Sequence, residues 1–439
     1  MISFVHCSDL HLGFAQYGEE TRFADFGRVF ADIIDYAICH QVDYFLIAGD
    51  LFNKRNINSR TLNQAITLLR RLRDAGISVI AIEGNHDKAP YGEQDSWMWF
   101  LNQQGYLHLL QPDFVDGCLT LTPYDHIRGS GSVLEFPGIR FVGLGYQGSM
   151  MPRRLQELSE QLEEFPGITV LLLHSALARM MHLGGIAWED IAPLRSRVDY
   201  VAMGHIHRRY EEDGWIFNPG APECWDLGES QAEKGFYHVI WPEESKAAQV
   251  RFIPSRRRLA KTITVEVASC QSPEEVYERC IGAAAQLALP AESGAMLRLT
   301  LQGSLPFNPL ALDLAHIESK VRALTCCLVV EIENNCWAEQ VSFSGSEGSQ
   351  LSREVLERQV LAGLFAQDPH LKGAQSTLVD LALTLKEATA SQADDAELAR
   401  AIEELAQQLV AKEEAGLVAV QQGQAQTAAG IEVEGEKQD

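Results

Sequence analysis

The sequence has 439 residues, 46% of them hydrophobic, and its formal net charge is −24 at pH 7. A chain of this length exceeds one ordinary hydrophobic core, so we expect two or three domains, and no run of about 18 apolar residues predicts a membrane span. Such a negative net charge is untypical of a stand-alone nucleic-acid binder. Any contact with a polyanion must therefore use a local basic patch, bound cations or a partner protein.

Short apolar runs, rich in valine and isoleucine, recur through the first half of the chain. In order they are ISFVHCSD (2–9), VDYFLIAGD (42–50), ISVIAIEGNHD (77–87), IRFVGLG (139–145), ITVLLLHS (168–175) and VDYVAMGHIH (198–207). Runs that are apolar without alternation are typical of strands buried on both faces of a sheet. We therefore expect six buried strands in this region.

Helical patterns lie between several of these runs. In residues 58–76, four aliphatic residues from Leu62 to Leu72 recur at spacings of four, three and three, which places them on one helix face. Asn58 or Ser59 can cap the start of this helix, and Gly76 can end it. Alternating strands and helices predict a layered α/β fold.

Five of the expected strands end on side chains that can bind metal ions. These residues are, in order, Asp9 and His11; Asp50; Asn85, His86 and Asp87; His174; and His205 and His207. In open α/β sheets, functional sites form at the carboxyl ends of strands. Five such ends in succession predict one shared site.

The chemistry of this set favours two divalent ions. Carboxylate, amide and imidazole ligands together suit Mn²⁺, Fe²⁺ or Zn²⁺, and the absence of cysteine among them disfavours a structural zinc site. Seven ligands are too many for one ion, but one carboxylate can bridge two. Two ions about 3.5–4 Å apart can hold a phosphate and the attacking hydroxide for in-line displacement.

The motifs at these strand ends resemble those of the calcineurin-like metallophosphoesterases. They are Asp9-Leu10-His11, Gly49-Asp50-Leu51-Phe52, Gly84-Asn85-His86-Asp87, the single His174 and Gly204-His205-Ile206-His207. The segments HCSDLHLG, AGDLFNKR and EGNHD are most similar to the SbcD-type nucleases, the nuclease subunits of SbcC–SbcD DNA repair complexes, and to their archaeal and eukaryotic relatives. The motifs cover residues 1 to about 225.

This resemblance implies a role for each residue of the set. Asp9, His11 and His207 would hold one metal ion, whereas Asn85, His174 and His205 would hold the other. Asp50 would bridge both ions. The resemblance makes His86 the catalytic histidine, which steadies the scissile phosphate and helps to protonate the leaving oxygen. Asp87 would orient His86 or a ligand.

One position departs from the pattern. Archaeal and eukaryotic relatives have a histidine directly after the Gly-Asp-Leu-Phe motif, where this chain has Asn53. That histidine is tied to exonuclease action, so its replacement leaves the polarity of digestion open. The neighbouring Lys54 and Arg55 are candidate DNA contacts, with solvated surface cations as the alternative.

The middle of the chain predicts a second, smaller domain. Residues 259–338 follow a strand–helix–strand–helix–strand order, and the preceding residues 1–258 would form the phosphoesterase domain. The resemblance implies that this α/β cap domain binds DNA beside the metal site. Arg256, Arg257 and Arg258 at the junction are candidate contacts to the DNA backbone, and a basic linker is the alternative.

The last quarter of the chain predicts helices and then a disordered tail. Segments 351–366 and 394–415 read as amphipathic helices, the second with Leu398, Ile402, Leu405 and Leu409 on one stripe. The resemblance implies that the helical segment 349–415 binds an SMC-like ATPase. From residue 416 to 439 the composition predicts disorder.

The sequence therefore predicts a DNA exonuclease, with endonuclease action left open, that uses two divalent ions, Mn²⁺ being the expected metal. Its expected partners are DNA, the ATPase and a second copy of the chain. The nine cysteines include no Cys-X-X-Cys pair and the N-terminus shows no signal peptide pattern, so we expect a cytoplasmic protein. Two alternatives remain: a metallophosphatase for nucleotides or phosphoproteins, and a non-hydrolytic scaffold for the ATPase.

Overall fold

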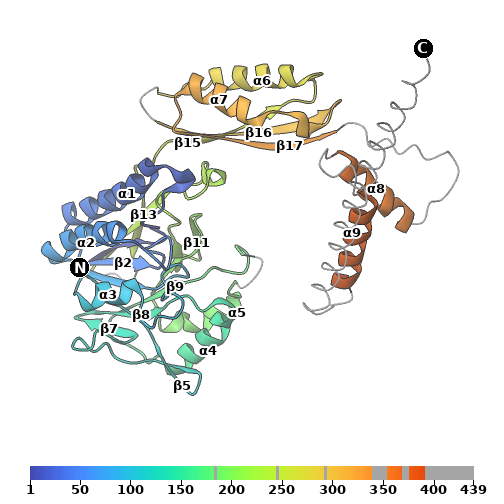
Figure 1. Ribbon diagram of the computed structural model, residues 1–439. Coiled ribbons are helices and arrows are strands. Elements are labelled where there is room, and N and C mark those ends of the chain that lie inside the picture. Colours follow the sequence, from blue (N-terminus) through green and yellow to red (C-terminus); the bar gives the residue numbers. More distant parts are fainter. Residues whose placement is uncertain (182–184, 244–246, 291–293, 339–352, 368–374, 391–439) are drawn as a thin grey trace, which may run out of the picture. The chain divides into compact units, whose positions relative to one another are not determined.

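The computed structural model describes residues 1–181, 185–243, 247–290, 294–338, 353–367 and 375–390 (Figure 1). By its internal contacts the chain divides into two compact units. The first unit comprises Met1–Ile263, Leu287–Leu299 and Val321–Glu331, and the second holds the remaining described residues. The candidate site lies wholly in the first unit.

The first unit is built on two six-stranded sheets. The first sheet has the order β14 (Gln249–Pro254), β13 (Gly235–Trp241), β1 (Ile2–Cys7), β2 (Tyr44–Ala48), β3 (Ser78–Ile82) and β4 (His108–Leu109). The second has the order β11 (Tyr210–Glu212), β12 (Ile216–Asn218), β10 (Tyr200–Gly204), β9 (Ile168–His174), β8 (Ile139–Leu144) and β7 (Val133–Phe136). A separate hairpin pairs β5 (Asp113–Val115) with β6 (Cys118–Thr120).

The inner strands of each sheet are parallel. Strands β1 to β4 run parallel in the first sheet, as do β8, β9, β10 and β12 in the second. Their carboxyl ends therefore meet at one edge of each sheet. The six predicted apolar runs form β1, β2, β3, β8, β9 and β10, which confirms the layered α/β fold.

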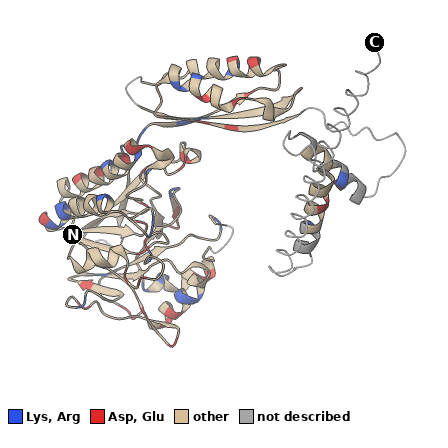
Figure 2. Ribbon diagram, in the orientation of Figure 1, with Lys and Arg blue, Asp and Glu red and all other residues tan. Residues whose placement is uncertain are grey.

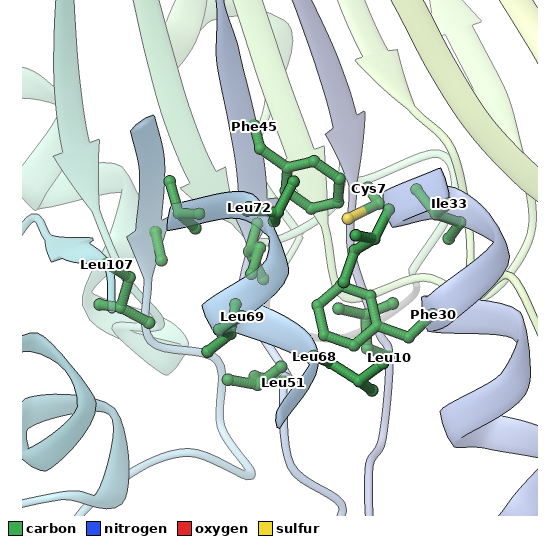
Figure 3. Close-up of a cluster of buried hydrophobic side chains, with 14 of the residues drawn as sticks. Cys7, Leu10, Phe30, Ile33, Phe45, Leu51, Leu68, Leu69, Leu72 and Leu107 are labelled. Atoms are coloured by element: carbon green, nitrogen blue, oxygen red, sulfur yellow. The ribbon is translucent and has the colours of Figure 1, made fainter. Parts of the chain in front are cut away.

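Helices cover the outer faces of both sheets. Helices α1 (Glu20–Cys39), α2 (Ser59–Asp74) and α3 (Trp97–Gln103) share one buried hydrophobic cluster with the first sheet. Helices α4 (Met151–Gln161) and α5 (Trp188–Ile191) share another with the second sheet. Figure 3 shows Phe45 and Cys7 from the strands facing Leu72 and Phe30 from the helices. Burial of each leucine or phenylalanine side chain in this cluster contributes about 1.5–3 kcal/mol to folding.

Helix α2 shows how the sequence sets these boundaries. The side chain of Asn58 accepts a hydrogen bond from the amide of Thr61 at 2.9 Å and so caps the first turn. Gly76 adopts φ +74° two residues after the helix ends. Leu69 and Leu72 are fully buried against the first sheet.

The inner faces of the two sheets pack on each other through a third apolar cluster. It contains Phe4 and Leu46 of the first sheet together with Phe141 and Leu172 of the second. His6 adds a polar link, because its two ring nitrogens lie 3.0 Å from the hydroxyl of Tyr200 and 3.0 Å from the carbonyl of Met203. The burial of His6 lowers its pKa to about 3, so it links the sheets as a neutral ring.

A third sheet follows, in the order β15 (Ala260–Glu266), β16 (Met296–Leu305) and β17 (Val329–Ala338), and the division between the units passes through it. Helices α6 (Pro273–Ala285) and α7 (Leu314–Thr325) alternate with these strands as predicted and lie along one face of the sheet (Figure 1).

The second unit also contains α8 (Arg353–Gln367) and α9 (Gln375–Ala390). They pack on each other, with ion pairs from Arg358 to Asp380 and from Lys386 to Glu357. Helix α8 matches the predicted segment 351–366, whereas α9 was not predicted. The predicted helix 394–415 and tail 416–439 lie outside the described residues. Among the helices that are described, none has the length and hydropathy to cross a bilayer.

Candidate metal centre

Ligand-type side chains from both sheets converge where the parallel strands end. The cluster contains three groups of residues. Within each group, the potential ligand atoms all lie within 4.8 Å of one another. They are Asp9, His11 and His207; His11, Asp50 and His86; and Asp50, His174 and His205. The groups share His11 and Asp50, so they form one continuous cluster. The residues come from the ends of β1, β2, β3, β9 and β10, which is the arrangement that the sequence predicts.

The backbone is strained at four of these residues. Asp9, His11 and Asp50 have φ values of 54°, 47° and 53°, and His205 has 100°. Left-handed backbone is uncommon for residues other than glycine, and such strain gathers at functional sites where the surrounding fold enforces it. Here it turns each side chain into the cluster directly after its strand.

Two motif glycines leave room for these side chains. A Cβ atom on Gly84 would lie 2.0 Å from Oδ1 of Asp50, and one on Gly49 would lie 2.2 Å from Nδ1 of His174. Gly49 also has φ +90°. The glycines of the Gly-Asp and Gly-Asn-His-Asp motifs are therefore required by close approach to the cluster.

The first group centres on a close pair of imidazoles. Nε2 of His11 lies 3.0 Å from Nε2 of His207, and Oδ1 of Asp9 lies 4.0 Å from Nε2 of His207. Asp9 is fully buried and accepts hydrogen bonds from the Ser8 hydroxyl and the His205 amide. Nδ1 of His11 is buried and has no hydrogen-bond partner among the described residues. Facing nitrogens beside a buried carboxylate make a donor set that fits a divalent cation.

The third group, of Asp50, His174 and His205, surrounds His174. Its Nδ1 donates to the carbonyl of Ala48 at 2.8 Å, which leaves Nε2 as the ligating atom. That Nε2 lies 3.3 Å from Oδ2 of Asp50 and 3.3 Å from Oδ1 of Asn85. The His205 ring stands beside His174, with ring centroids 5.0 Å apart. Asn85 therefore joins the cluster as well.

Burial and charge decide the protonation of these rings. Burial lowers the pKa of His11 to about 3 and that of His205 to about 4, so both rings are neutral and able to bind a metal. Burial also lowers the pKa of His174, but the attraction of Asp50 outweighs it and raises the pKa to about 9. The proton on His174 therefore balances the negative charge of Asp50, as a bound cation would.

His86 and Asp87 follow Asn85 but have different surroundings. His86 is partly exposed, and its Nδ1 donates to the carbonyl of Asn53 at 2.8 Å, which leaves Nε2 as the ring nitrogen that can contact a substrate. Asp87 is buried and accepts hydrogen bonds from the backbone amides of Leu51, Phe52 and Gly84. Asp87 therefore holds together the two loops that carry Asp50 and His86.

The sequence reasoning missed a carboxylate behind the first group. Oε1 of Glu229, in a short 3₁₀ helix (Leu227–Glu229), lies 2.8 Å from Nδ1 of His207. Its Oε2 accepts hydrogen bonds from Lys234 Nζ at 2.6 Å and from the Trp225 amide at 3.0 Å. Carboxylates in this position orient metal-binding histidines. No local pattern in the sequence identifies Glu229, because it lies 22 residues after its partner.

Trp225 is a second residue that the sequence did not identify. Its indole Nε1 donates to Oδ1 of Asn53 at 3.0 Å, and its ring stacks on Phe14 at 5.4 Å. The ring centroids of His207 and Trp225 are 5.4 Å apart. Asn53, the residue that departs from the family pattern, thus holds His86 through its carbonyl and Trp225 through its side chain.

The side chains of the candidate DNA contacts differ in whether they already make contacts within the protein. Lys54 is exposed, and the guanidinium of Arg55 lies 5.0 Å from the ring centroid of Tyr91. Arg256 is exposed, but Arg257 donates to the Ser230 carbonyl at 2.7 Å and Arg258 is ion-paired with Asp25. The side chains of Arg257 and Arg258 therefore already serve internal contacts.

Comparison with known families agrees with this geometry. Residues 2–209 match the family described as calcineurin-like phosphoesterase. Residues 2–209 are a calcineurin-like phosphoesterase domain. All nine predicted metal and catalytic residues lie within it, whereas Trp225, Glu229 and Lys234, which lie behind the first group, are beyond it.

The chain is also similar to curated proteins of known name. The chain is 30% identical over 240 residues to the DNA double-strand break repair protein Mre11 of Archaeoglobus fulgidus, covering 52% of each chain. It is 32% identical over 209 residues to the Mre11 protein of Aeropyrum pernix, covering 47% of this chain and 49% of that one. This chain thus spans about half the length of these relatives. A solved dimetal phosphatase from Danio rerio is 13% identical, with a TM-score of 0.38, and covers 58% of this chain and 97% of that one.

Proposed function

We propose that this protein is a metal-dependent DNA nuclease that hydrolyses phosphodiester bonds at the cluster described above. The observation that supports this most strongly is the convergence of ligand-type side chains from five strand ends into one buried cluster inside a phosphoesterase domain. Similarity to proteins named for DNA double-strand break repair points to DNA as the substrate.

In this proposal two divalent ions, with Mn²⁺ as the expected metal, bind the cluster. Asp9, His11 and His207 would hold one ion. Asn85, His174 and His205 would hold the other, and Asp50 would contribute to both. Bound ions of this kind polarise phosphoryl oxygens and lower the pKa of water to near neutrality. The neutral state of His11 and His205 supports these assignments.

The chain's own groups then orient the substrate. His86, fixed through Nδ1 by the Asn53 carbonyl, presents Nε2 to the scissile phosphate or to the leaving oxygen. Asp87 acts as a positioning residue, because its carboxylate ties the loops of Asp50 and His86 together. Lys54, Arg55 and Arg256 remain candidate contacts to the DNA backbone.

The remaining parts of the prediction belong to the same proposal. Residues 1–258 act as the nuclease domain, 259–338 as a DNA-binding cap, and 349–415 as the segment that binds an SMC-like ATPase. The chain forms a homodimer and works in the cytoplasm. All nine cysteines are unpaired, which supports a reducing compartment.

The decisive experiment is degradation of end-labelled linear DNA by the purified chain with Mn²⁺, alongside His86→Ala. We expect degradation by the wild type that is abolished by EDTA and reduced at least about 100-fold in the variant. A parallel assay compares bis(p-nitrophenyl) phosphate with p-nitrophenyl phosphate. Preference for the monoester without DNA degradation would replace the nuclease by a phosphatase, and equal DNA degradation by both proteins would refute the role of His86.

A further inference from the structure

Two consecutive arginines follow His207, and their environments differ sharply. Arg209 donates to Glu233 at 2.8 Å and to Glu211 at 2.6 Å, and its guanidinium lies 4.3 Å from the ring centroid of Phe252. Arg208 is exposed, and within the part of the chain that is described its side chain makes no ion pair, hydrogen bond or ring contact. Arg209 is thus a structural residue, whereas the charge of Arg208 is left unpaired.

Arg208 lines an open cavity of about 560 Å³ at the edge of the metal centre. The cavity is bounded by His205, Ile206, His207, Arg208, Gly228, Glu229, Gln231 and Ala232. Two of these residues, His205 and His207, are proposed metal ligands. A ligand in the cavity would therefore reach both the metal centre and Arg208.

The one carboxylate in the cavity wall does not neutralise Arg208. Glu229 is engaged by Nδ1 of His207, by the amide of Trp225 and by Lys234. Lys234 is itself buried, with 1% of its side chain exposed, and also donates to the His207 carbonyl at 2.9 Å. The Glu229 charge is thus balanced by its own partners, and among the described residues no carboxylate of the cavity wall pairs with the exposed Arg208.

A free cation at this place is significant in so acidic a protein. The net charge is −24, and acidic and basic positions are interspersed along α1 and α6 (Figure 2). A polyanionic substrate must therefore be attracted by local positive groups rather than by the overall field. Arginine is suited to this task, because its planar guanidinium can bind two oxygens of one phosphate.

We propose that Arg208 binds a backbone phosphate next to the scissile one and that the cavity seats the nucleotide between them. The inference rests on the proposed nuclease function and deepens it, because it defines the substrate class as an oligonucleotide with at least two phosphates. A diester with a single phosphate occupies the metal centre alone and gains nothing from Arg208.

The test compares three thymidine dinucleotides: d(TpT), which has only the scissile phosphate, d(pTpT) and d(TpTp). We expect wild-type kcat/KM to be roughly tenfold higher for one of the two phosphorylated forms, since one charge-assisted contact stabilises binding by about 1.4 kcal/mol. The preferred form also gives the direction in which the strand lies. Arg208→Ala should remove this preference through KM and leave d(TpT) hydrolysis within twofold, whereas Arg208→Lys should retain part of it.

Arg195→Ala is the matched control, because Arg195 is an exposed arginine paired with Asp213 and does not line the cavity. It should retain the full preference. A wild type that hydrolyses all three substrates equally, or an Arg208→Ala variant that keeps the preference, would overturn the inference while the nuclease function stands.

A binding measurement separates the inference from the nuclease activity. Fluorescently labelled oligothymidylate is titrated in EDTA at several salt concentrations. The logarithm of the association constant falls as log [salt] rises. We expect Arg208→Ala to make this slope less steep by about 0.7, the value for one phosphate contact on a single strand. An unchanged slope would refute the contact, even if no substrate is hydrolysed. If the wild type hydrolyses none of the substrates but Arg208→Ala still changes the salt dependence of binding, the nuclease function alone is refuted.

Discussion

At the scale of single residues, the orientation and the tautomer of His207 depend on a side chain that is distant in the sequence. Glu229 accepts from its Nδ1 and is itself held by Lys234 and the Trp225 amide. The carboxylate fixes which ring nitrogen carries the proton and so leaves Nε2 as the ligating atom. Metal affinity should therefore depend on the charge of Glu229 as well as on the ligands.

Glu229→Gln tests this dependence, because it preserves shape and removes charge. We expect the affinity for Mn²⁺, measured by isothermal titration calorimetry, to fall by roughly 10–100-fold. The control is Glu233→Gln, which alters an exposed partner of Arg209 and should leave the affinity unchanged. Equal affinities in all three proteins would show that Glu229 does not support the metal centre.

A second residue-scale prediction concerns Asp25. Its carboxylate is buried and paired with Arg22, Arg28 and Arg258. Burial raises its pKa, but hydrogen bonds from Arg258 and Arg22 outweigh this and hold the pKa below its usual value. Asp25 therefore stabilises the fold at pH values above the unfolded pKa of about 3.9, and this contribution is lost as the pH falls through the folded pKa.

Asp25→Asn should lower the free energy of unfolding at pH 7 by about 1.5–3 kcal/mol, since it removes the charged acceptor that Arg22 and Arg258 share, although Arg22 keeps its pair with Glu223. Urea unfolding should show that this difference from the wild type shrinks below about pH 4. The exposed Asp35, which is paired with Arg71, is the control, and Asp35→Asn should change stability by at most about 1 kcal/mol. A difference for Asp25→Asn that is constant from pH 7 to pH 3 would contradict the assignment.

The residues of the cluster differ in how far the sequence could predict them. Asp9, Asp50 and His174 were predictable because each follows an apolar strand and therefore lies at a known edge of a sheet. Glu229 and Arg208 were not predictable. Glu229 matters because it contacts His207, which lies 22 residues earlier in the sequence, and Arg208 matters because its side chain has no partner among the described residues. Local patterns identify where a strand ends, but they do not identify partners that only the folded chain brings together.

At the scale of elements, the loops after β2 and β3 are packed as one unit. Gly84 lies against Asp50, and Asp87 holds the amides of Leu51 and Phe52. A single added methyl group in this contact should displace the Asp50 carboxylate from the cluster.

Gly84→Ala tests this packing. The new Cβ would lie 2.0 Å from the Asp50 Oδ1 and 2.6 Å from its backbone nitrogen. We expect Mn²⁺ binding by calorimetry to weaken at least tenfold, accompanied by a lower melting temperature. Gly282→Ala in α6 is the control, because nothing lies within 4 Å of its added methyl group, and it should stabilise the protein by up to about 1 kcal/mol. Normal metal binding by Gly84→Ala would show that the loops can relax.

The elements themselves were predictable in part. Buried parallel strands have a continuous apolar pattern, so β1, β2, β3, β8, β9 and β10 were all identified. The antiparallel β13 was not, although it lies inside the first sheet, between β14 and β1. Its pairing with β1 depends on the topology, which no short stretch of sequence contains.

At the scale of the whole molecule, the helices after the third sheet carry the proposed contact to an SMC-like ATPase. Deletion of residues 349–415 should abolish co-purification with such an ATPase and leave Mn²⁺-dependent hydrolysis of a small phosphodiester within about twofold, because the metal centre lies in the first unit. The measurement is size-exclusion chromatography of the mixed proteins. Retained binding by the shortened chain would place the contact elsewhere.

The position of β13 has a consequence for how the chain folds as it is made. Strand β1 lies between β2 and β13, and its register pairs Ile2 with Trp241. Strand β1 therefore keeps one open edge until β13 has been synthesised, which takes on the order of ten seconds or more at about 5–20 residues per second. During this interval β1 is an apolar edge strand that is open to unwanted pairing with other chains. A slightly shorter stretch of chain separates His11 from Glu229, so the nascent chain can complete the candidate cluster only after every strand of the first two sheets except β13 and β14 has emerged.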